Sequence, residues 1–159
     1  MTARRHLQRI SILQHLRPVP FRRDRLRALV RKALAQVAPG AADLRILVVD
    51  DRDMRAWNRR FLHRFRTTNV LSFPEDEPRN AAPERLSGDI LISAPTCLRQ
   101  TRGWPGSPEE RVFFFIVHGL LHLAGYGHER GGEEARRMRR AEMKIYLSAL
   151  GRSSAGARG

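Results

Sequence analysis

Residues 112–128 read VFFFIVHGLLHLAGYGH and form the longest stretch of the chain without a formally charged side chain. Seventeen residues lie at the lower limit for a transmembrane helix, and three glycines with two internal histidines are unfavourable within a bilayer. Glu109 and Glu110 come just before the stretch, and negative charge in the first turn of a helix complements its dipole. We therefore expect a helix that is buried on most sides and lies at the centre of a soluble core.

Working outward from this helix, the chain alternates between strand and helix patterns. Apolar spacing near 3.6 residues predicts helices over 24–37, 50–64 and 133–150, and a short helix is expected after Pro95. Asp50 or Asp51 is expected to cap the second of these helices, with the side chains of Met54, Trp57, Phe61 and Phe65 on its inner side. The Trp57 and Phe61 pair is expected to belong to the core, the alternative being a platform on which bases stack. Alternating or β-branched runs predict strands over 6–13, at a sheet edge, and over 44–49, 69–73 and 88–93.

This order of elements predicts an α+β (mixed α/β) fold, in which a small mixed sheet of about four strands packs with helices. The sequence shows no internal repeat and no sign of a second core. We therefore predict a single domain over residues 1–150, followed by a disordered tail over 151–159.

The chain has 159 residues, of which 30 are basic and 16 acidic, giving a formal net charge of +14. Such an excess favours binding to polyanions, meaning RNA, DNA or an anionic membrane face. Lys32 and Lys144 are the only lysines, so nearly all of the positive charge is arginine. A GC-rich genome explains arginine in place of lysine, but it does not explain the excess of base over acid. We therefore expect a nucleic acid partner.

The single cysteine, Cys97, excludes an intramolecular disulfide and fits a reducing compartment, and its expected role is that of a small packed side chain. The N-terminus lacks the apolar segment of a secretory signal, although its arginines leave a mitochondrial-type presequence open. We expect a cytoplasmic protein with no membrane association and no disulfide-linked partner.

The apolar helix contains His118 and His122, whose spacing of four residues places both imidazoles on one face. Three residues later comes Gly125, the usual residue for turning a chain out of a helix in the left-handed conformation. The chain can then fold back and bring His128 over the same face. Three neutral imidazoles leave a fourth coordination position open, which is typical of a catalytic zinc site. We predict one zinc ion per chain, although the ligand type also suits nickel, copper or iron.

The alternative for any one of these histidines is a core imidazole satisfied by a backbone carbonyl. All of them together, with the glycine between, match the skeleton H-E-x-x-H-x-x-G-x-x-H of the metzincin peptidases. Gly119 stands where those enzymes carry glutamate as general base, so the usual group for activating water against an amide is missing. An open tri-histidine zinc site keeps its full positive charge and would attract a phosphodiester. With the net charge of +14, this favours phosphoryl chemistry on a nucleic acid over peptide hydrolysis.

At this point the residues resemble a known family. The motif VHGLLHLAGYGH (117–128) is similar to the H-G-x-L-H-L-x-G-Y-D-H signature of the YbeY family, bacterial metal-dependent endoribonucleases linked to ribosomal RNA maturation. TNVLSFP (68–74) is similar to the family's T-D/N-V-L-S-F-P block. GDI (88–90) followed by Ala94-Pro95 is similar to its G-D-I-x-I-x-x-P block. The resemblance covers about residues 40–150.

The resemblance implies zinc held by His118, His122 and His128, a cleft beside the sheet, and single-stranded RNA as substrate. It also implies a role in 3′-end maturation of the RNA of the small ribosomal subunit (16S) and in ribosome quality control. No general base stands out, so the catalytic group is expected to be water on the metal. Asp89 is expected either to orient a ligand histidine or to cap a turn, and Glu129 is expected to be a surface carboxylate.

Two positions depart from the family pattern. Gly127 stands where the family usually has aspartate, and Leu62 stands where it tends to have an arginine suited to gripping phosphate near the metal. Arg60, Arg64 and Arg66 lie on the same segment and are candidates to bind the substrate instead, the alternative being a solvated helix face.

These observations leave three hypotheses. The first is a zinc-dependent endoribonuclease acting in ribosomal RNA maturation. The second is a zincin-like metallopeptidase, which is less favoured because Gly119 stands in place of the glutamate base. The third is a non-catalytic protein that binds RNA or the ribosome and holds a structural metal, a hypothesis that the residues at positions 62 and 127 keep open.

Overall fold

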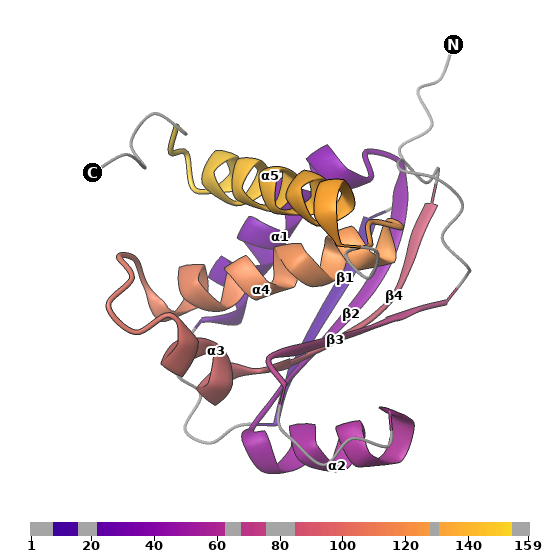
Figure 1. The fold of residues 1–159 in the computed structure, drawn as a ribbon, viewed down its shortest axis with the longest axis vertical. Helices are drawn as coiled ribbons and strands as arrows, with labels where there is room; N and C mark the ends of the chain where they lie inside the picture. Colours follow the sequence, from indigo (N-terminus) through magenta and orange to yellow (C-terminus); the bar gives the residue numbers. More distant parts are fainter. Residues whose placement is uncertain (1–7, 16–21, 63–67, 76–84, 128–130, 154–159) are drawn as a thin grey trace.

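The computed structural model describes residues 8–15, 22–62, 68–75, 85–127 and 131–153 (Figure 1). The strands are β1 (Gln8–Gln14), β2 (Ala41–Val49), β3 (Val70–Pro74) and β4 (Arg85–Ser93), and the helices are α1 (Arg23–Val37), α2 (Asp51–Leu62), α3 (Ala94–Gln100), α4 (Pro108–Leu123) and α5 (Gly132–Ala149). Every predicted strand and helix is present, and the α+β prediction is confirmed. Residues 154–159 of the predicted tail lie outside the described residues.

The four strands form one sheet in the order β1-β2-β4-β3. The first three of these are parallel, and β3 runs antiparallel to β4 at the far edge, so the sheet is mixed as predicted. The edge position expected for the first strand is confirmed. The second strand is longer than predicted, because it pairs with the neighbouring strand from Ala41 onward, directly after the turn at Pro39 and Gly40.

Helices α1, α4 and α5 lie on one side of the sheet, and α2 lies on the other (Figure 1). Alternation along the strands divides the apolar side chains accordingly. Ile46, Val48 and Ile90 join the main core beneath the helices, whereas Val49 and Leu91 form a second, much smaller cluster with Met54 of α2. We call these two sides the covered face and the open face of the sheet. Helix α4 contacts α1, α3, α5, β3 and β4, which confirms its central place.

Local sequence fixes where α4 begins. The Ser107 hydroxyl accepts a hydrogen bond from the Glu110 amide at 3.3 Å, and the Glu110 carboxylate accepts one from the Ser107 amide at 3.2 Å. This reciprocal pair is a capping box, and Pro108 in the first turn has no amide hydrogen that would need a partner.

Throughout the described ranges, no helix has both the length and the apolar character required to cross a bilayer.

Helix α2 corrects one sequence-based prediction. Asp50 caps it, accepting a hydrogen bond from the Asp53 amide at 2.8 Å, and Met54 is fully buried as expected. Phe61, however, is 47% exposed and does not lie in the core. It stacks on Trp57 with ring centroids 4.9 Å apart and meets the edge of Phe73 at 6.0 Å. The apolar stripe of α2 was identified correctly, but the second cluster is too small to cover the end of it. Phe65 lies outside the described residues.

These aromatic rings border a groove on the open face with a volume of about 590 Å³. Leu13, which is 57% exposed, lines the groove from β1, and Leu47 and Leu91 line it from the two central strands.

Cys97 is fully buried in the main core, which confirms its predicted packing role. Burial raises the pKa of its thiol well above the ordinary range, so the side chain stays protonated.

Candidate metal centre

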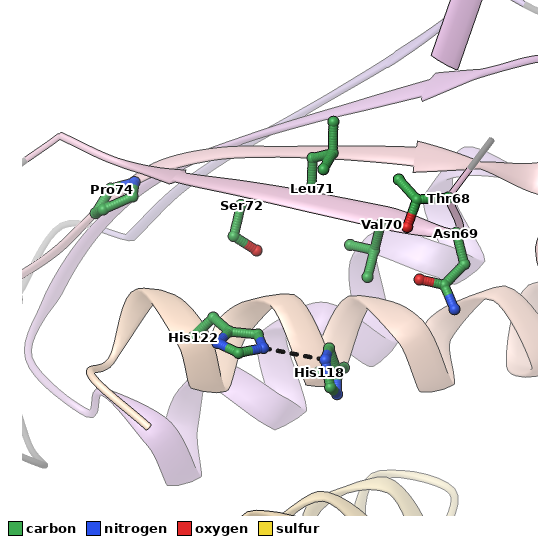
Figure 2. A pocket seen from close by; sticks show the side chains of 8 residues that line it. All are labelled: Thr68, Asn69, Val70, Leu71, Ser72, Pro74, His118 and His122. Atoms are coloured by element: carbon green, nitrogen blue, oxygen red, sulfur yellow. Dashed lines mark hydrogen bonds between the residues drawn. The ribbon is translucent and has the colours of Figure 1, made fainter. Parts of the chain in front are cut away.

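His118 and His122 lie one turn apart on α4 and face the edge strand β3 (Figure 2). Their Nε2 atoms are 3.0 Å apart, and their rings meet edge to face with centroids 4.7 Å apart. Both residues are partly buried. The predicted convergence of these two imidazoles on one helix face is therefore present.

The two imidazoles open into a pocket of about 490 Å³. Its opposite wall is β3 and the residues just before it, comprising Thr68, Asn69, Val70, Leu71, Ser72 and Pro74. Figure 2 shows Val70 and Ser72 directed toward the helix, while the Leu71 side chain points away from it. The Asn69 amide donates a hydrogen bond to Gln100 at 2.9 Å. The pocket thus combines two imidazoles with hydroxyl and amide groups beside a sheet edge.

Gly119 lies at a close approach of α4 to the sheet. The Ser72 hydroxyl donates a hydrogen bond to the Gly119 carbonyl at 3.2 Å. A Cβ atom added at position 119 would stand 3.0 Å from the Ser72 hydroxyl and 3.2 Å from a methyl carbon of Ile90. A side chain at this position would crowd both residues, so Ser72 and Ile90 would have to shift to accommodate a glutamate. Crowding at position 119 is thus a steric reason for the absence of a glutamate there.

The C-terminus of α4 turns as the sequence predicts. Gly125 has a φ of 96°, in the region that glycine adopts readily and other residues avoid. The amide of Gly125 bonds to the carbonyl of His122 at 3.0 Å, and the amide of Tyr126 bonds to the carbonyl of Leu121 at 2.9 Å. This pair of bonds is a Schellman motif. It turns the chain out of the helix, and the third predicted ligand, His128, lies outside the described residues together with Glu129.

Gly127 is exposed, and space remains around it. The nearest atom to an added Cβ is a carboxylate oxygen of Glu134, at 4.0 Å. A side chain could therefore be accommodated at position 127, but an aspartate there would face a like charge from the first turn of α5.

One residue of this site is absent from the sequence-based predictions. Glu142 of α5 lies 2.9 Å from Nδ1 of His118 through a carboxylate oxygen, and it is only 8% exposed. The signal was present in the last helix, where Glu142 falls at helical spacing between the buried residues Met138 and Ile145. A carboxylate within an apolar stripe is costly to bury unless it is paired, so it indicates a partner across the interface.

The residues present fit a bound metal ion. A carboxylate only accepts hydrogen bonds, so we assign the proton of the His118 ring to Nδ1, which leaves the Nε2 lone pair facing the pocket. Two zinc–nitrogen bonds of about 2.0–2.1 Å in a tetrahedral arrangement would separate the nitrogens by about 3.3 Å. The observed 3.0 Å is close to this separation. Among the described residues no group of three metal-ligating side chains is found, so the three-histidine set remains a prediction that depends on His128.

The predicted role of Asp89 and the predicted substrate-binding arginines have different outcomes. Asp89 neither orients a histidine nor caps a turn, because alternation along β4 places it on the open face, where both carboxylate oxygens pair with the guanidinium of Arg45. Arg60 is exposed on α2 with its guanidinium 5.5 Å from the Phe61 ring centroid, and it does not line the pocket. Arg64 and Arg66 lie outside the described residues. A role for any of these arginines in substrate binding remains a prediction.

A family model, several relatives and a solved structure each match most of this chain. The family model described as "Endoribonuclease YbeY" matches residues 12–150. A protein of that name from Geobacter metallireducens is 36% identical over 140 residues, which cover 87% of this chain and 93% of the relative. Another from Aquifex aeolicus is 34% identical, covering 92% of this chain and 95% of the relative. The solution structure of a Thermotoga maritima protein superposes with a TM-score of 0.61 at 22% identity, over 94% of this chain and 99% of that one.

Proposed function

This chain belongs to the endoribonuclease YbeY family, and on that basis we propose that it is a zinc-dependent endoribonuclease that cleaves single-stranded RNA. We further propose that it acts in the cytoplasm on the RNA of the small ribosomal subunit, in 3′-end maturation and in ribosome quality control. The relatives named above carry the endoribonuclease name, and the strong positive charge of the chain suits a polyanionic substrate.

One observation carries the proposal. The Nε2 atoms of His118 and His122 face one another at 3.0 Å on the wall of a pocket, opposite an edge strand. A buried helix holds both rings, so little conformational freedom is lost when a cation binds between them. Zinc bound there would supply a Lewis acid for a phosphodiester oxygen and would lower the pKa of a bound water.

The remaining residues of the pocket suit a nucleotide. Thr68, Asn69 and Ser72 bring hydroxyl and amide groups to the wall opposite the histidines, where they can donate hydrogen bonds to phosphate or sugar oxygens. The pocket volume of about 490 Å³ lies in the range of roughly 300–1,000 Å³ that is typical of small-ligand sites. It therefore suits an unpaired nucleotide better than a duplex.

The peptidase alternative is less favoured by the same geometry. Position 119 holds a glycine where such peptidases carry a glutamate as general base, and the close contact of α4 with Ser72 and Ile90 would crowd a larger side chain there. The chain therefore keeps a candidate metal pocket without that machinery.

The test begins with metal content. Protein purified without a histidine tag or a chelator should contain about one zinc per chain. His118→Ala and His122→Ala should each lose the metal and abolish cleavage of a single-stranded RNA, while circular dichroism remains that of the folded protein. His15→Ala is the matched control, because His15 is exposed and does not line the pocket.

The results separate the hypotheses. Cleavage unchanged by both pocket substitutions would point to a contaminating nuclease and would overturn the proposal. Full zinc content with RNA binding and no cleavage would support a structural metal in a binding protein. Cleavage of casein in place of RNA would support a peptidase.

A further inference from the structure

We propose that Glu142 is a positioning residue that sets the tautomer of His118 and thereby the affinity of the pocket for its metal. The proposal rests on the zinc site inferred above and adds a residue from a different helix. Glu142 does not line the pocket and is expected to touch neither metal nor substrate.

The first step is the burial of the carboxylate. The side chain of Glu142 is 10% exposed and that of His118 is 30% exposed, so their contact is largely shielded from water. On the same helix, Met138 and Ile145 lie one turn before and one turn after it, and both are buried in the main core. An apolar residue would suit such a position well. A carboxylate kept there needs a hydrogen-bond donor, and the 2.9 Å contact with Nδ1 supplies one.

The second step is the consequence for the imidazole. A neutral histidine carries its proton on one nitrogen and a lone pair on the other, and only the lone pair can bind a metal. An acceptor at Nδ1 keeps the proton on that atom, so the lone pair lies on Nε2, the atom that faces His122 at 3.0 Å. The same hydrogen bond also restrains rotation of the ring about its bond to Cβ.

The third step is the direction of the contact. Glu142 approaches from α5, whereas the pocket lies between α4 and β3. Glu142 therefore contacts His118 from the side away from the pocket. Hydrogen bonds of this kind behind a metal-binding histidine generally change metal affinity about 10–100-fold when they are removed.

The test uses Glu142→Leu, which removes the acceptor and fits the apolar stripe, and Glu142→Gln, which keeps the shape and a weaker, uncharged acceptor. Zinc titration of the metal-free proteins against a chelating dye should show affinity lowered about 10–100-fold for the leucine variant. The glutamine variant should lose less, about 3–10-fold, because an uncharged acceptor makes a hydrogen bond about half as strong. Glu133→Leu, an exposed carboxylate of the same helix, is the matched control for charge and should leave the affinity unchanged.

A second measurement reports the tautomer directly. Nitrogen-15 NMR of the metal-free wild type should show the His118 proton on Nδ1, and the leucine variant should show a substantial fraction with the proton on Nε2. Thermal unfolding of each variant establishes that it is folded.

The outcomes distinguish this inference from the proposed function. A wild-type protein that binds no zinc would overturn the proposed function, while the NMR measurement would still test the role of Glu142. A wild type that binds zinc, with a leucine variant of equal affinity and an unchanged tautomer, would overturn the inference alone. If the leucine variant does not fold, a glutamine variant with wild-type affinity and an unaltered imidazole spectrum would also overturn it.

Discussion

The covered and open faces of the sheet are built from the same strands, yet they differ in how much apolar surface they bury. Beneath α1, α4 and α5, side chains such as Phe113 and Ile116 are fully buried in one continuous core. On the open face the buried cluster is limited to Val49, Met54 and Leu91, and Phe61 beside it is 47% exposed. The difference shows that alternation along a strand assigns side chains to a face, but the helices decide whether that face is buried.

The candidate metal centre lies on the covered face, where packing is tightest. His118 and His122 project from a helix that contacts five other elements, and Glu142 contacts His118 across the interface between α4 and α5. A groove also exists on the open face, but it is lined by the partly exposed rings of Trp57, Phe61 and Phe73 and by one surface ion pair. Because His118 and His122 lie on the more deeply buried face, their motion is restricted.

The largest expected effect is on the covered face. Phe113→Ala should lower the free energy of unfolding by about 3–5 kcal/mol, because a fully buried ring is removed from a core that can only partly collapse. Urea unfolding followed by circular dichroism measures this change. A loss below about 1 kcal/mol would show that the covered face is much looser than its burial indicates.

A smaller loss is expected where α4 meets the sheet. Gly119→Ala should lower the free energy of unfolding by about 1–3 kcal/mol, because the new methyl group would crowd Ser72 and Ile90. Gly127→Ala, at an exposed glycine with no atom closer than 4.0 Å to an added Cβ, is the control and should change stability little. Equal stability of the two variants would contradict the close approach described above.

A third effect tests how α2 is attached to α3 and to the end of β4. Asp51 accepts hydrogen bonds from Ser93 and Arg99, each at 2.7 Å, and from Thr96. Burial alone would raise the pKa of Asp51, but the hydrogen bonds from Thr96, Ser93 and Arg99 outweigh it and hold the pKa below its ordinary value. Asp51→Asn should therefore lower the free energy of unfolding by about 1–2 kcal/mol at neutral pH.

The pH dependence gives this third effect its sign. A carboxyl group whose pKa is lowered by folding stabilises the protein above its unfolded pKa of about 3.9, and this contribution is lost as the pH falls through the folded value. The difference between wild type and Asp51→Asn should therefore be full at pH 7 and shrink in acid below about pH 4. A difference that stays constant down to pH 2 would show that charge at Asp51 plays no part.

The smallest effect is expected at the rim of the open groove. Phe61→Ala should lower the free energy of unfolding by no more than about 1 kcal/mol, because nearly half of the ring is already in water. Together with Phe113→Ala this makes a matched pair of the same substitution on opposite faces. A loss of 3 kcal/mol or more at Phe61 would remove the distinction between the faces.

The sequence predicted features that depend on local spacing. The helical separation of His118 and His122 and the turn at Gly125 follow from residues within one turn of each other, and both are present. Glu142 could not be assigned in this way, because its contact joins two helices across 24 residues and depends on how α5 packs. The predicted role of Asp89 and the predicted burial of Phe61 are wrong for a related reason. A period of two or 3.6 residues predicts which side chains share one face of a strand or helix. It does not predict which of the faces will be covered by other elements.

The alternation of β3 has a consequence for how this protein can change over evolution. Val70 and Ser72 point toward α4 and line the histidine pocket, whereas Leu71 and Phe73 pack with the cluster on the open face. Consecutive codons of one short strand therefore act on separate surfaces. Substitutions at positions 70 and 72 can alter the histidine pocket while those at 71 and 73 adapt the opposite face, and the two sets can be selected independently. A single-residue insertion within the strand would exchange the two sets and change both surfaces at once.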